Sequence, residues 1–302
     1  MIMSYPKVLA LGSLKTERTF IGPVYVQEKV DGSQFRFGVD HGELVMASHH
    51  SQLYADNQDK SFKPAMDYVK SVSEKILEHP DQTYFFCEYL SKPKHNHITY
   101  TTTPHNMLML FDCFTDSKWV TYEELQGVAA NLDIGIAPLF FDGFTTLDDT
   151  LGLLKIESYL GGSQVEGVVI KNYNEVFPEC GVERPVFSKL VNAQFKEVKA
   201  VDDKKGKQSL NDFLFAFRTE ARWNKAIQTM REAGTLQISP RDIGPLLDAV
   251  RKDIAEEEAD NIKDWLYRYY IKQIQQFAIS GLPEWYKNEL LKNVETPDVK
   301  PE

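Results

Sequence analysis

The chain has 302 residues, 42% hydrophobic and 12% aromatic, a composition that excludes a disordered protein and allows one large domain with a smaller one. The formal net charge of −10 disfavours indiscriminate nucleic-acid binding, which usually needs an excess of Lys and Arg, but it leaves room for a local basic groove. No apolar run approaches the roughly 18 residues that cross a bilayer, and the N-terminal residues lack a signal peptide's apolar stretch, so neither membrane insertion nor export is expected.

Three cysteines, Cys87, Cys113 and Cys180, are odd in number and fit no metal spacing. The first two lie in apolar, strand-like runs, which favours buried free thiols. A reducing, cytoplasmic setting is therefore expected, whether the gene is cellular or carried by a phage.

The first 200 residues alternate between short apolar runs and turns. Period-two alternation and abundant Val, Phe and Tyr predict strands at Val24–Gln27, Gln34–Val39, Glu43–Ala47, Tyr84–Leu90, Met107–Cys113, Val165–Lys171 and Pro185–Leu190. Helical spacing predicts helices at Phe62–Leu77, Thr121–Leu132 and Thr146–Tyr159. Strands interleaved irregularly with a few helices indicate an α+β domain of antiparallel sheets flanked by helices.

The pattern changes near residue 200. Residues 201–207 are polar and turn-like, which predicts a linker between a domain at 1–200 and a small all-helical domain at 208–302. Helices are predicted in the latter at Leu210–Ala233, Pro240–Glu257, Ala259–Ala278 and Glu284–Lys292. Ser239 followed by Pro240 has the form of an N-cap with proline at the first helical position.

Lys29 is the first candidate for chemistry. It ends a predicted strand and is followed at once by Asp31-Gly32-Ser33 after one intervening valine. A lysine that is partly desolvated or near another cation has a depressed pKa and attacks as a neutral amine, and a glycine lets the backbone approach a ligand closely. Taken alone, the pattern K-x-D-G occurs often by chance and favours a solvated turn.

Further polar residues follow Lys29 inside apolar runs. Glu88 lies in Phe86–Leu90, Phe111 in Leu108–Phe114, Glu166 and Lys171 bound one strand, and Lys189 closes another. Each has an ordinary structural explanation, such as a core position for Phe111. Together they supply what adenylyl transfer needs: an amine nucleophile, cations for the phosphates, carboxylates for a metal and the ribose, and an aromatic face for adenine.

In this order the residues resemble the covalent nucleotidyltransferase superfamily of polynucleotide ligases and mRNA capping enzymes. Motifs I, III, IIIa, IV and V of that superfamily are similar to Lys29–Gly32, Phe86–Leu90, Leu110–Phe114, Glu166–Lys171 and Phe187–Leu190. Glu28 directly before the lysine, and the helical C-terminal region in place of a β-barrel, resemble the phage RNA ligase 2 branch.

The resemblance implies a role for each motif residue. Lys29 would form the lysyl-AMP intermediate, Glu28 with the neighbouring backbone would read the adenine amino group, and Glu88 would contact the ribose. Phe111 would stack on the purine. Glu166 would bind the catalytic metal, with Asp31 as a second metal contact, and Lys189, with Lys171 as a further candidate, would contact the phosphates.

Two departures concern the phosphate contacts. Ligases usually carry an arginine a short distance after the nucleophile, whereas this chain has His49 and His50, which are either partial replacements or part of a solvated turn. The last motif usually has the pattern K-x-K, whereas Leu190 and Val191 follow Lys189; Lys196 or Lys199 could supply the missing charge.

Two more clusters are ambiguous. Helical spacing places Arg218, Arg222, Lys225 and Arg231 near one face, either a solvated helix surface or a phosphate-contacting surface for RNA. The pair in His95-Asn96-His97 has no third ligand at a familiar spacing, which favours a loop without a metal.

The expected function is therefore an ATP-dependent RNA ligase, with ATP and Mg²⁺ or Mn²⁺, that joins 3′-hydroxyl and 5′-phosphate ends in RNA repair or nick sealing. Its expected partners are RNA ends, a nicked RNA duplex or an RNA/DNA hybrid, and a monomer is favoured. The alternatives are a DNA ligase, a GTP-dependent capping guanylyltransferase, and a non-catalytic module that binds RNA ends.

Overall fold

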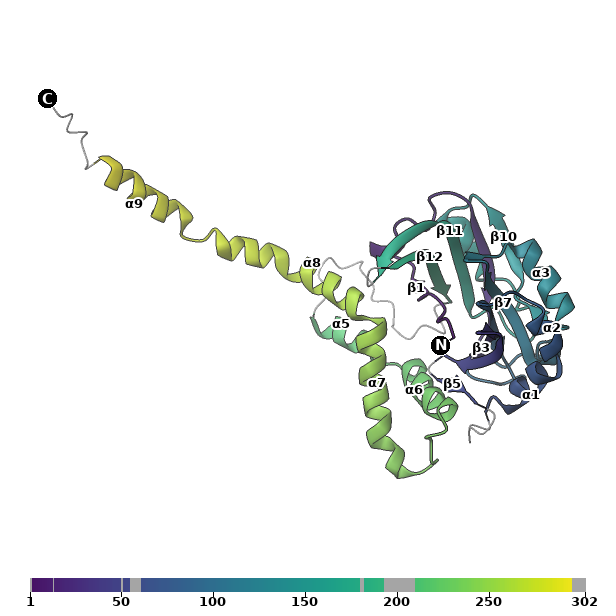
Figure 1. The fold of residues 1–302 in the computed structure, drawn as a ribbon. Helices are drawn as coiled ribbons and strands as arrows, with labels where there is room; N and C mark the ends of the chain where they lie inside the picture. The colour runs from purple at the N-terminus through teal and green to yellow at the C-terminus, as the bar shows by residue number, and fades with distance from the viewer. Residues whose placement is uncertain are drawn as a thin grey trace. The chain divides into compact units, whose positions relative to one another are not determined.

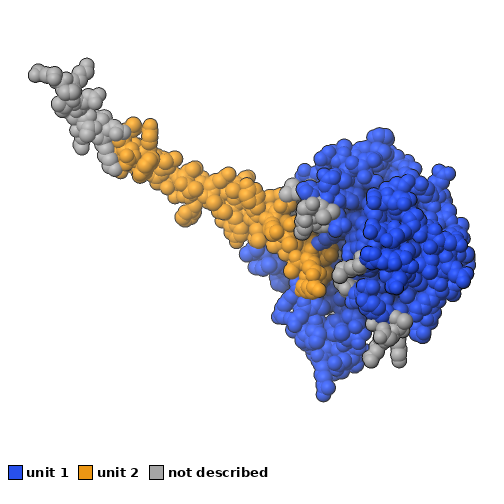
Figure 2. Space-filling view, in the orientation of Figure 1, with its two compact units in different colours: residues 1–251 blue, residues 252–302 orange. Residues whose placement is uncertain are grey.

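A computed structural model describes residues 2–12, 14–49, 51–54, 61–179, 182–192 and 210–294. The chain divides into two compact units, Met1–Arg251 and Lys252–Glu302, shown in different colours in Figure 2. The predicted linker at 201–207, His50, Cys180, Lys196 and Lys199 lie outside the described residues. The predicted division into domains at this linker therefore stays a prediction.

The first unit contains two sheets, and several of their strands are labelled in Figure 1. The first sheet has the order β1-β12-β11-β2-β10, and all its pairs are antiparallel except β1 with β12. Its strands are β1 (Leu9–Ala10), β2 (Val24–Lys29), β10 (Leu139–Gly143), β11 (Gly167–Glu179) and β12 (Val182–Val191).

The second sheet has the order β5-β4-β3-β6-β7-β8, with β9 (Gly135–Ile136) joining β7 in parallel. Its other strands are β3 (Ser33–Asp40), β4 (Glu43–Ser48), β5 (Gln52–Leu53), β6 (Thr83–Tyr89), β7 (Leu108–Thr115) and β8 (Lys118–Trp119). In the described chain the sheets exchange strands twice, between β2 and β3 and between β9 and β10.

Helices cover one face of the second sheet. They are α1 (Lys63–Ser71), α2 (Ser73–Leu77) and α3 (Tyr122–Asn131), and the short 3₁₀ segments η1 (Leu14–Thr16) and η2 (His105–Met107) lie in the connections. Phe35 and Phe37 of β3 pack here with Met66 of α1 and Leu125 of α3, and Cys87 and Cys113 are buried free thiols in the same core, as predicted. Burial of these alternate, apolar strand positions is the main driving force for this layer.

Two predicted helices are shorter than expected. The stretch 62–77 is interrupted at Val72, between α1 and α2. The stretch 146–159 is helical only in α4 (Leu147–Leu153), whose N-terminus is capped by Thr146. Beyond α4 the chain turns through residues 154–165, because Ser158 and Leu160 are drawn into buried contacts with β2 and the loop before η2.

The C-terminal region is helical in the residues described, as predicted. It contains α5 (Leu210–Ala216), α6 (Glu220–Glu232), the 3₁₀ turn η5 (Pro240–Asp242), α7 (Ile243–Glu257), α8 (Ala259–Ala278) and α9 (Leu282–Val294). The predicted helix 210–233 is two helices, because the Thr219 side chain caps α6. Ser239 is an N-cap whose backbone N–H donates in return to the Asp242 carboxylate, which confirms the predicted start signal.

The two sheets meet through aromatic side chains. Trp119 of β8 contacts Phe187 of β12 with ring centroids 5.8 Å apart, and Tyr5 lies 5.5 Å from Phe187 and 5.0 Å from Phe86. Phe86 belongs to β6, so this cluster joins one face of each sheet. The sheet faces that carry Lys29 and Glu88 are continuous with these aromatic faces, because side chains alternate along each strand.

Candidate active site

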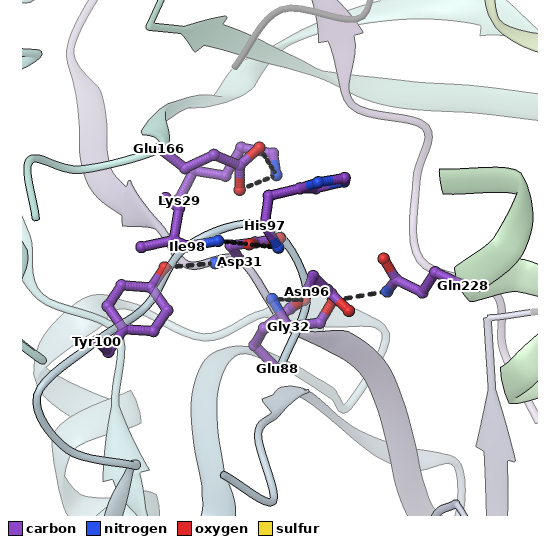
Figure 3. Close-up of polar contacts among 10 residues, drawn as sticks. All are labelled: Lys29, Asp31, Gly32, Glu88, Asn96, His97, Ile98, Tyr100, Glu166 and Gln228. Carbon is purple, nitrogen blue, oxygen red and sulfur yellow. Dashed lines mark hydrogen bonds and ion pairs between the residues drawn. The ribbon is translucent and has the colours of Figure 1, made fainter. Parts of the chain in front are cut away.

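Lys29 is the last residue of β2 and forms an ion pair with Glu166 (Figure 3). Its Nζ lies 2.7 Å from both carboxylate oxygens of Glu166. The pairing of β2 with β11 places Lys29 opposite Gly167, so Glu166 directly before that glycine reaches the amine. A Cβ at position 167 would lie 2.4 Å from the Leu190 carbonyl oxygen, so only glycine permits this packing of β11 against β12.

The pKa of Lys29 is raised, contrary to the sequence-based expectation of a depressed pKa. Burial lowers it, but the negative charges of Glu166, Glu88 and Asp31 more than offset that influence. The lysine at rest is therefore an ammonium group held by Glu166. The sequence could indicate desolvation but not the number of carboxylates that the fold brings to the amine.

Glu88 faces the same site from β6. Its Oε1 accepts a hydrogen bond of 3.1 Å from the Gly32 backbone N–H. Burial raises the pKa of Glu88 to about 8, with Lys29 acting in the opposite direction and Glu166 adding to the rise. Gly32 makes this approach possible, because a Cβ there would lie 2.7 Å from the Glu88 Cγ and 2.8 Å from the Tyr89 carbonyl oxygen.

Asp31 connects the turn after Lys29 to a loop that follows β6. Its Oδ2 accepts hydrogen bonds of 2.7 Å from the backbone N–H groups of His97 and Ile98, and its own N–H donates to the Tyr100 hydroxyl at 2.8 Å. Through these bonds the Asp31 carboxylate has a structural role in holding the loop. Its predicted second contact to a metal stays a prediction.

Glu28 lies on the opposite face of β2 from Lys29. Val26 and Glu28 alternate with Gln27 and Lys29, and the Glu28 carboxylate accepts bonds from the Ser158 hydroxyl and, at 3.0 Å, from the Tyr159 N–H. Burial raises the pKa of Glu28, and those two bonds act in the opposite direction. This placement does not favour the predicted contact between its carboxylate and adenine.

Lys171 and Phe111 lie within the cluster that joins the sheets. Lys171 is buried and pairs with Asp112 Oδ2 at 3.0 Å, and it donates to the Phe111 carbonyl oxygen at 2.6 Å. Such a desolvated, fully engaged ammonium group does not favour the predicted contact between Lys171 and the phosphates, which stays a prediction. The half-buried Phe111 ring has centroids of Tyr5 at 5.0 Å and Phe86 at 6.5 Å, and its stacking on a purine stays a prediction.

The residues that were expected to supply positive charge to the phosphates lie in different surroundings. Lys189 pairs in register with Val169 on the face of the sheet that carries Lys29, and its charge acts to lower the pKa of Glu166, which burial raises. His49 is exposed just after β4. Arg36 of β3 is buried and donates to the carbonyl oxygens of Met3 and Ser48, so it fastens the N-terminal segment rather than replacing the expected arginine.

Sequence reasoning missed Gln27. This residue is buried on the Lys29 face of β2, and its Oε1 accepts no hydrogen bond within the described residues. Period-two alternation could have placed it beside Lys29, since positions 27 and 29 of a strand share a face. A buried acceptor without a partner in such a position suits a ligand's donor.

A sequence model of the RNA ligase family matches residues 22–190, more than half of the chain. The chain belongs to the RNA ligase family. The matched region begins just before β2 and ends within β12, so it contains Lys29, Glu88, Glu166 and Lys189 and excludes the C-terminal helices. A search of curated proteins found no match.

Solved structures of other RNA ligases are similar in part. The Naegleria gruberi RNA ligase with pyrophosphate matches at 15% identity and a TM-score of 0.47, over 62% of this chain and 56% of that one. Mutants of the same enzyme match at 14% identity: one with AMP and manganese (TM-score 0.49, 64% and 57% coverage) and one with ATP and manganese (0.46, 62% and 56%). The chain thus spans less than two thirds of the length of these structures.

The carboxylates of this RNA ligase family member suit a divalent cation held partly by substrate. In the described residues no group of three or more His, Cys, Asp or Glu side chains could hold a metal ion. Mg²⁺ is usually bound by one or two carboxylates together with substrate phosphates and water, and Glu166 fits that donor set.

Among the residues that the structure describes, no helix is long and apolar enough to cross a membrane.

Proposed function

We propose that this chain is an ATP-dependent RNA ligase that works through a lysyl-AMP intermediate. The observation that carries the proposal is the Lys29 amine, held 2.7 Å from the Glu166 carboxylate within a segment that matches the RNA ligase family. A strand-end lysine surrounded by three carboxylates has little structural purpose, because a buried charge cluster is a weak source of stability.

In the first step, the Lys29 Nζ attacks the α-phosphorus of ATP. A nitrogen–phosphorus bond forms, the bond to the β-phosphate oxygen breaks and pyrophosphate leaves. The ammonium group must first lose a proton. Burial is the largest single influence on its pKa and acts downward, so weakening the charge of Glu166 is enough to bring the amine toward its reactive form.

A divalent cation at Glu166 would supply positive charge beside the phosphates. Lys189, on the same face of the sheet, is positioned to bind the phosphates of the nucleotide. Glu88 is positioned to bind a ribose hydroxyl, and at neutral pH its raised pKa lets it act as a donor as well as an acceptor. Gln27 offers an acceptor on the Lys29 face of β2.

The second and third steps complete the ligation. AMP passes from Lys29 to the 5′-phosphate of an RNA strand, and a 3′-hydroxyl then attacks that phosphorus, so that AMP leaves and a phosphodiester forms. We further propose that the substrates are RNA ends, nicked RNA duplexes and RNA/DNA hybrids. The enzyme is proposed to be a monomer located inside the cell, where ATP is available.

Mass spectrometry of the intact protein after incubation with ATP and magnesium tests the first step. We expect a mass gain of one AMP in the wild type and none in Lys29→Ala. The matched control Lys70→Ala, which changes an exposed residue of α1, should show the full gain. A gain from GTP but not ATP would contradict the ligase proposal, and no gain from either would favour a binding module. Sealing of nicked DNA but not RNA would contradict the substrate class.

A further inference from the structure

A cavity of about 290 Å³ lies beside the turn that follows Lys29. One wall is the loop after β6 and the other is helix α6, both within the first unit. Its lining residues are Lys94, Asn96, His97, Asn224, Ile227, Gln228 and Arg231.

The lining is suited to an anion. It contains two permanent cations, Lys94 and Arg231, and three amide side chains, but no carboxylate. Both cations are exposed, and neither forms an ion pair within the described residues. Arg presents a planar fork of donors and Lys a mobile point charge, the two forms in which proteins contact phosphate.

Two carboxylates next to the lining residues, Glu232 and Asp31, already accept hydrogen bonds. Glu232 at the end of α6 accepts hydrogen bonds from Gln228, at 2.6 Å, and from the Ser33 hydroxyl. The Asp31 carboxylate accepts the two backbone bonds from the loop. The cations in the cavity therefore remain available to an external anion.

Side chains that line the cavity donate hydrogen bonds to the turn that follows Lys29 (Figure 3). Asn96 Nδ2 donates to the Gly32 carbonyl oxygen at 2.6 Å, and Gln228 Nε2 donates to the same oxygen at 3.2 Å. His97 donates its backbone N–H to Asp31. A ligand in the cavity thus lies against the residues that fix the end of β2, on the α6 side of the turn.

We propose that this cavity binds a phosphate group of the RNA strand, with Lys94 and Arg231 as its principal contacts. The inference rests on the proposed function and deepens it, because it assigns the RNA rather than ATP to the α6 side of the site. The groups proposed to face the nucleotide are Glu166, directly before β11, and Lys189, in β12, whereas the cavity is built from the loop after β6 and from α6. It also places positive charge locally in a chain whose net charge is −10.

The test uses the double variant Lys94→Gln/Arg231→Gln in the full chain. Binding of a fluorescent RNA strand is measured over a range of salt concentrations, and formation of the protein–AMP adduct is measured separately. Loss of two phosphate contacts should weaken RNA binding about tenfold or more and reduce the slope of log affinity against log salt by about 1.4. Formation of the adduct from ATP should be unchanged.

Two further proteins control for charge and folding. Lys94→Arg/Arg231→Lys keeps both charges and should retain most of the affinity and the salt slope. Lys70→Gln/Lys118→Gln removes two exposed cations elsewhere and should bind RNA as the wild type does. Lys118 lies in β8 and pairs with Thr115 at one end of β7, whereas Tyr89 pairs with Leu108 at the other end.

The source of the phosphate is distinguished by comparing RNA strands with a 5′-phosphate and a 5′-hydroxyl. A loss confined to the phosphorylated strand supports the terminal phosphate as the ligand, and an equal loss supports an internal phosphodiester. Unchanged RNA affinity and salt slope in the double variant would overturn the inference while leaving the ligase proposal intact. A loss of adduct formation would also overturn it, since the cavity would then serve ATP or the position of Lys29. An absence of adduct in the wild type would instead contradict the proposed function.

Discussion

Replacing Glu166 by Gln tests how the fold controls the nucleophile. At the 2.7 Å separation of Lys29 Nζ from the carboxylate, two unit charges attract by ~6 kcal/mol at an effective dielectric constant of ~20. The Lys29 side chain is 28% exposed, so solvent screening reduces this to about 3 kcal/mol, equivalent to about two pKa units. Because the remaining burial acts downward, the variant should have a Lys29 pKa lower by about that amount.

The measurement is the rate at which an amine-reactive ester labels Lys29, followed by peptide mass spectrometry across pH without ATP or metal. Only the neutral amine reacts, so a fall of two pKa units should speed labelling about 100-fold in the range below the pKa. Glu175→Gln, in β11, the strand that follows Glu166, removes a carboxylate that is paired with Arg18; it is the matched control and should label as the wild type does. Unchanged or slower labelling in Glu166→Gln would refute the assigned cause of the raised pKa.

Three other predictions concern stability and the turn. Lys171→Met leaves Asp112 as a buried charge without its ammonium partner and should lower the free energy of unfolding in urea by about 3–5 kcal/mol; an unchanged midpoint would contradict the buried ion pair. The folded-state pKa of Glu88, about 8, lies above its usual value of 4.5, so this group's stabilising contribution is complete below about 4.5 and is lost as pH rises toward 8. Glu88→Gln should therefore flatten the fall of melting temperature across that window, and an equally steep fall would argue against the raised pKa. Gly32→Ala, whose Cβ would lie 2.7 Å from Glu88 Cγ, should displace Glu88 and reduce formation of the AMP adduct at least about tenfold, whereas Gly127→Ala on α3, with open space at its Cβ, should have no effect on it.

The positions of most strands could be predicted because they depend on local patterns, whereas the role of Lys29 as nucleophile stays a prediction. Alternation identified β2, β3, β6, β7, β11 and β12 to within a few residues at most of their ends, although β11 continues well beyond the predicted Lys171. Family membership rests on the same stretch, since the RNA ligase match spans the predicted motifs.

Contacts between distant segments could not be predicted in this way. Lys171 and Lys189 are both lysines in neighbouring strands, yet the first is buried against Asp112 and the second lies near Glu166. Helical spacing places Arg222 on one face with Arg218, Lys225 and Arg231. In the structure, however, the Arg222 side chain is buried, with 1% of its surface exposed. Helical spacing gives the relative directions of side chains and not which face the rest of the fold covers.

The two places where the chain passes between the sheets lie side by side. Residues 30–32 connect β2 to β3, residues 137–138 connect β9 to β10, and the Glu28 N–H donates to the Pro138 carbonyl oxygen at 3.0 Å. Lys29 lies on a strand of the first sheet and Glu166 directly before another, whereas Glu88 lies on the second sheet. The carboxylates around the Lys29 amine are therefore contributed from both sides of these crossings, and their arrangement depends on how the two sheets are joined there.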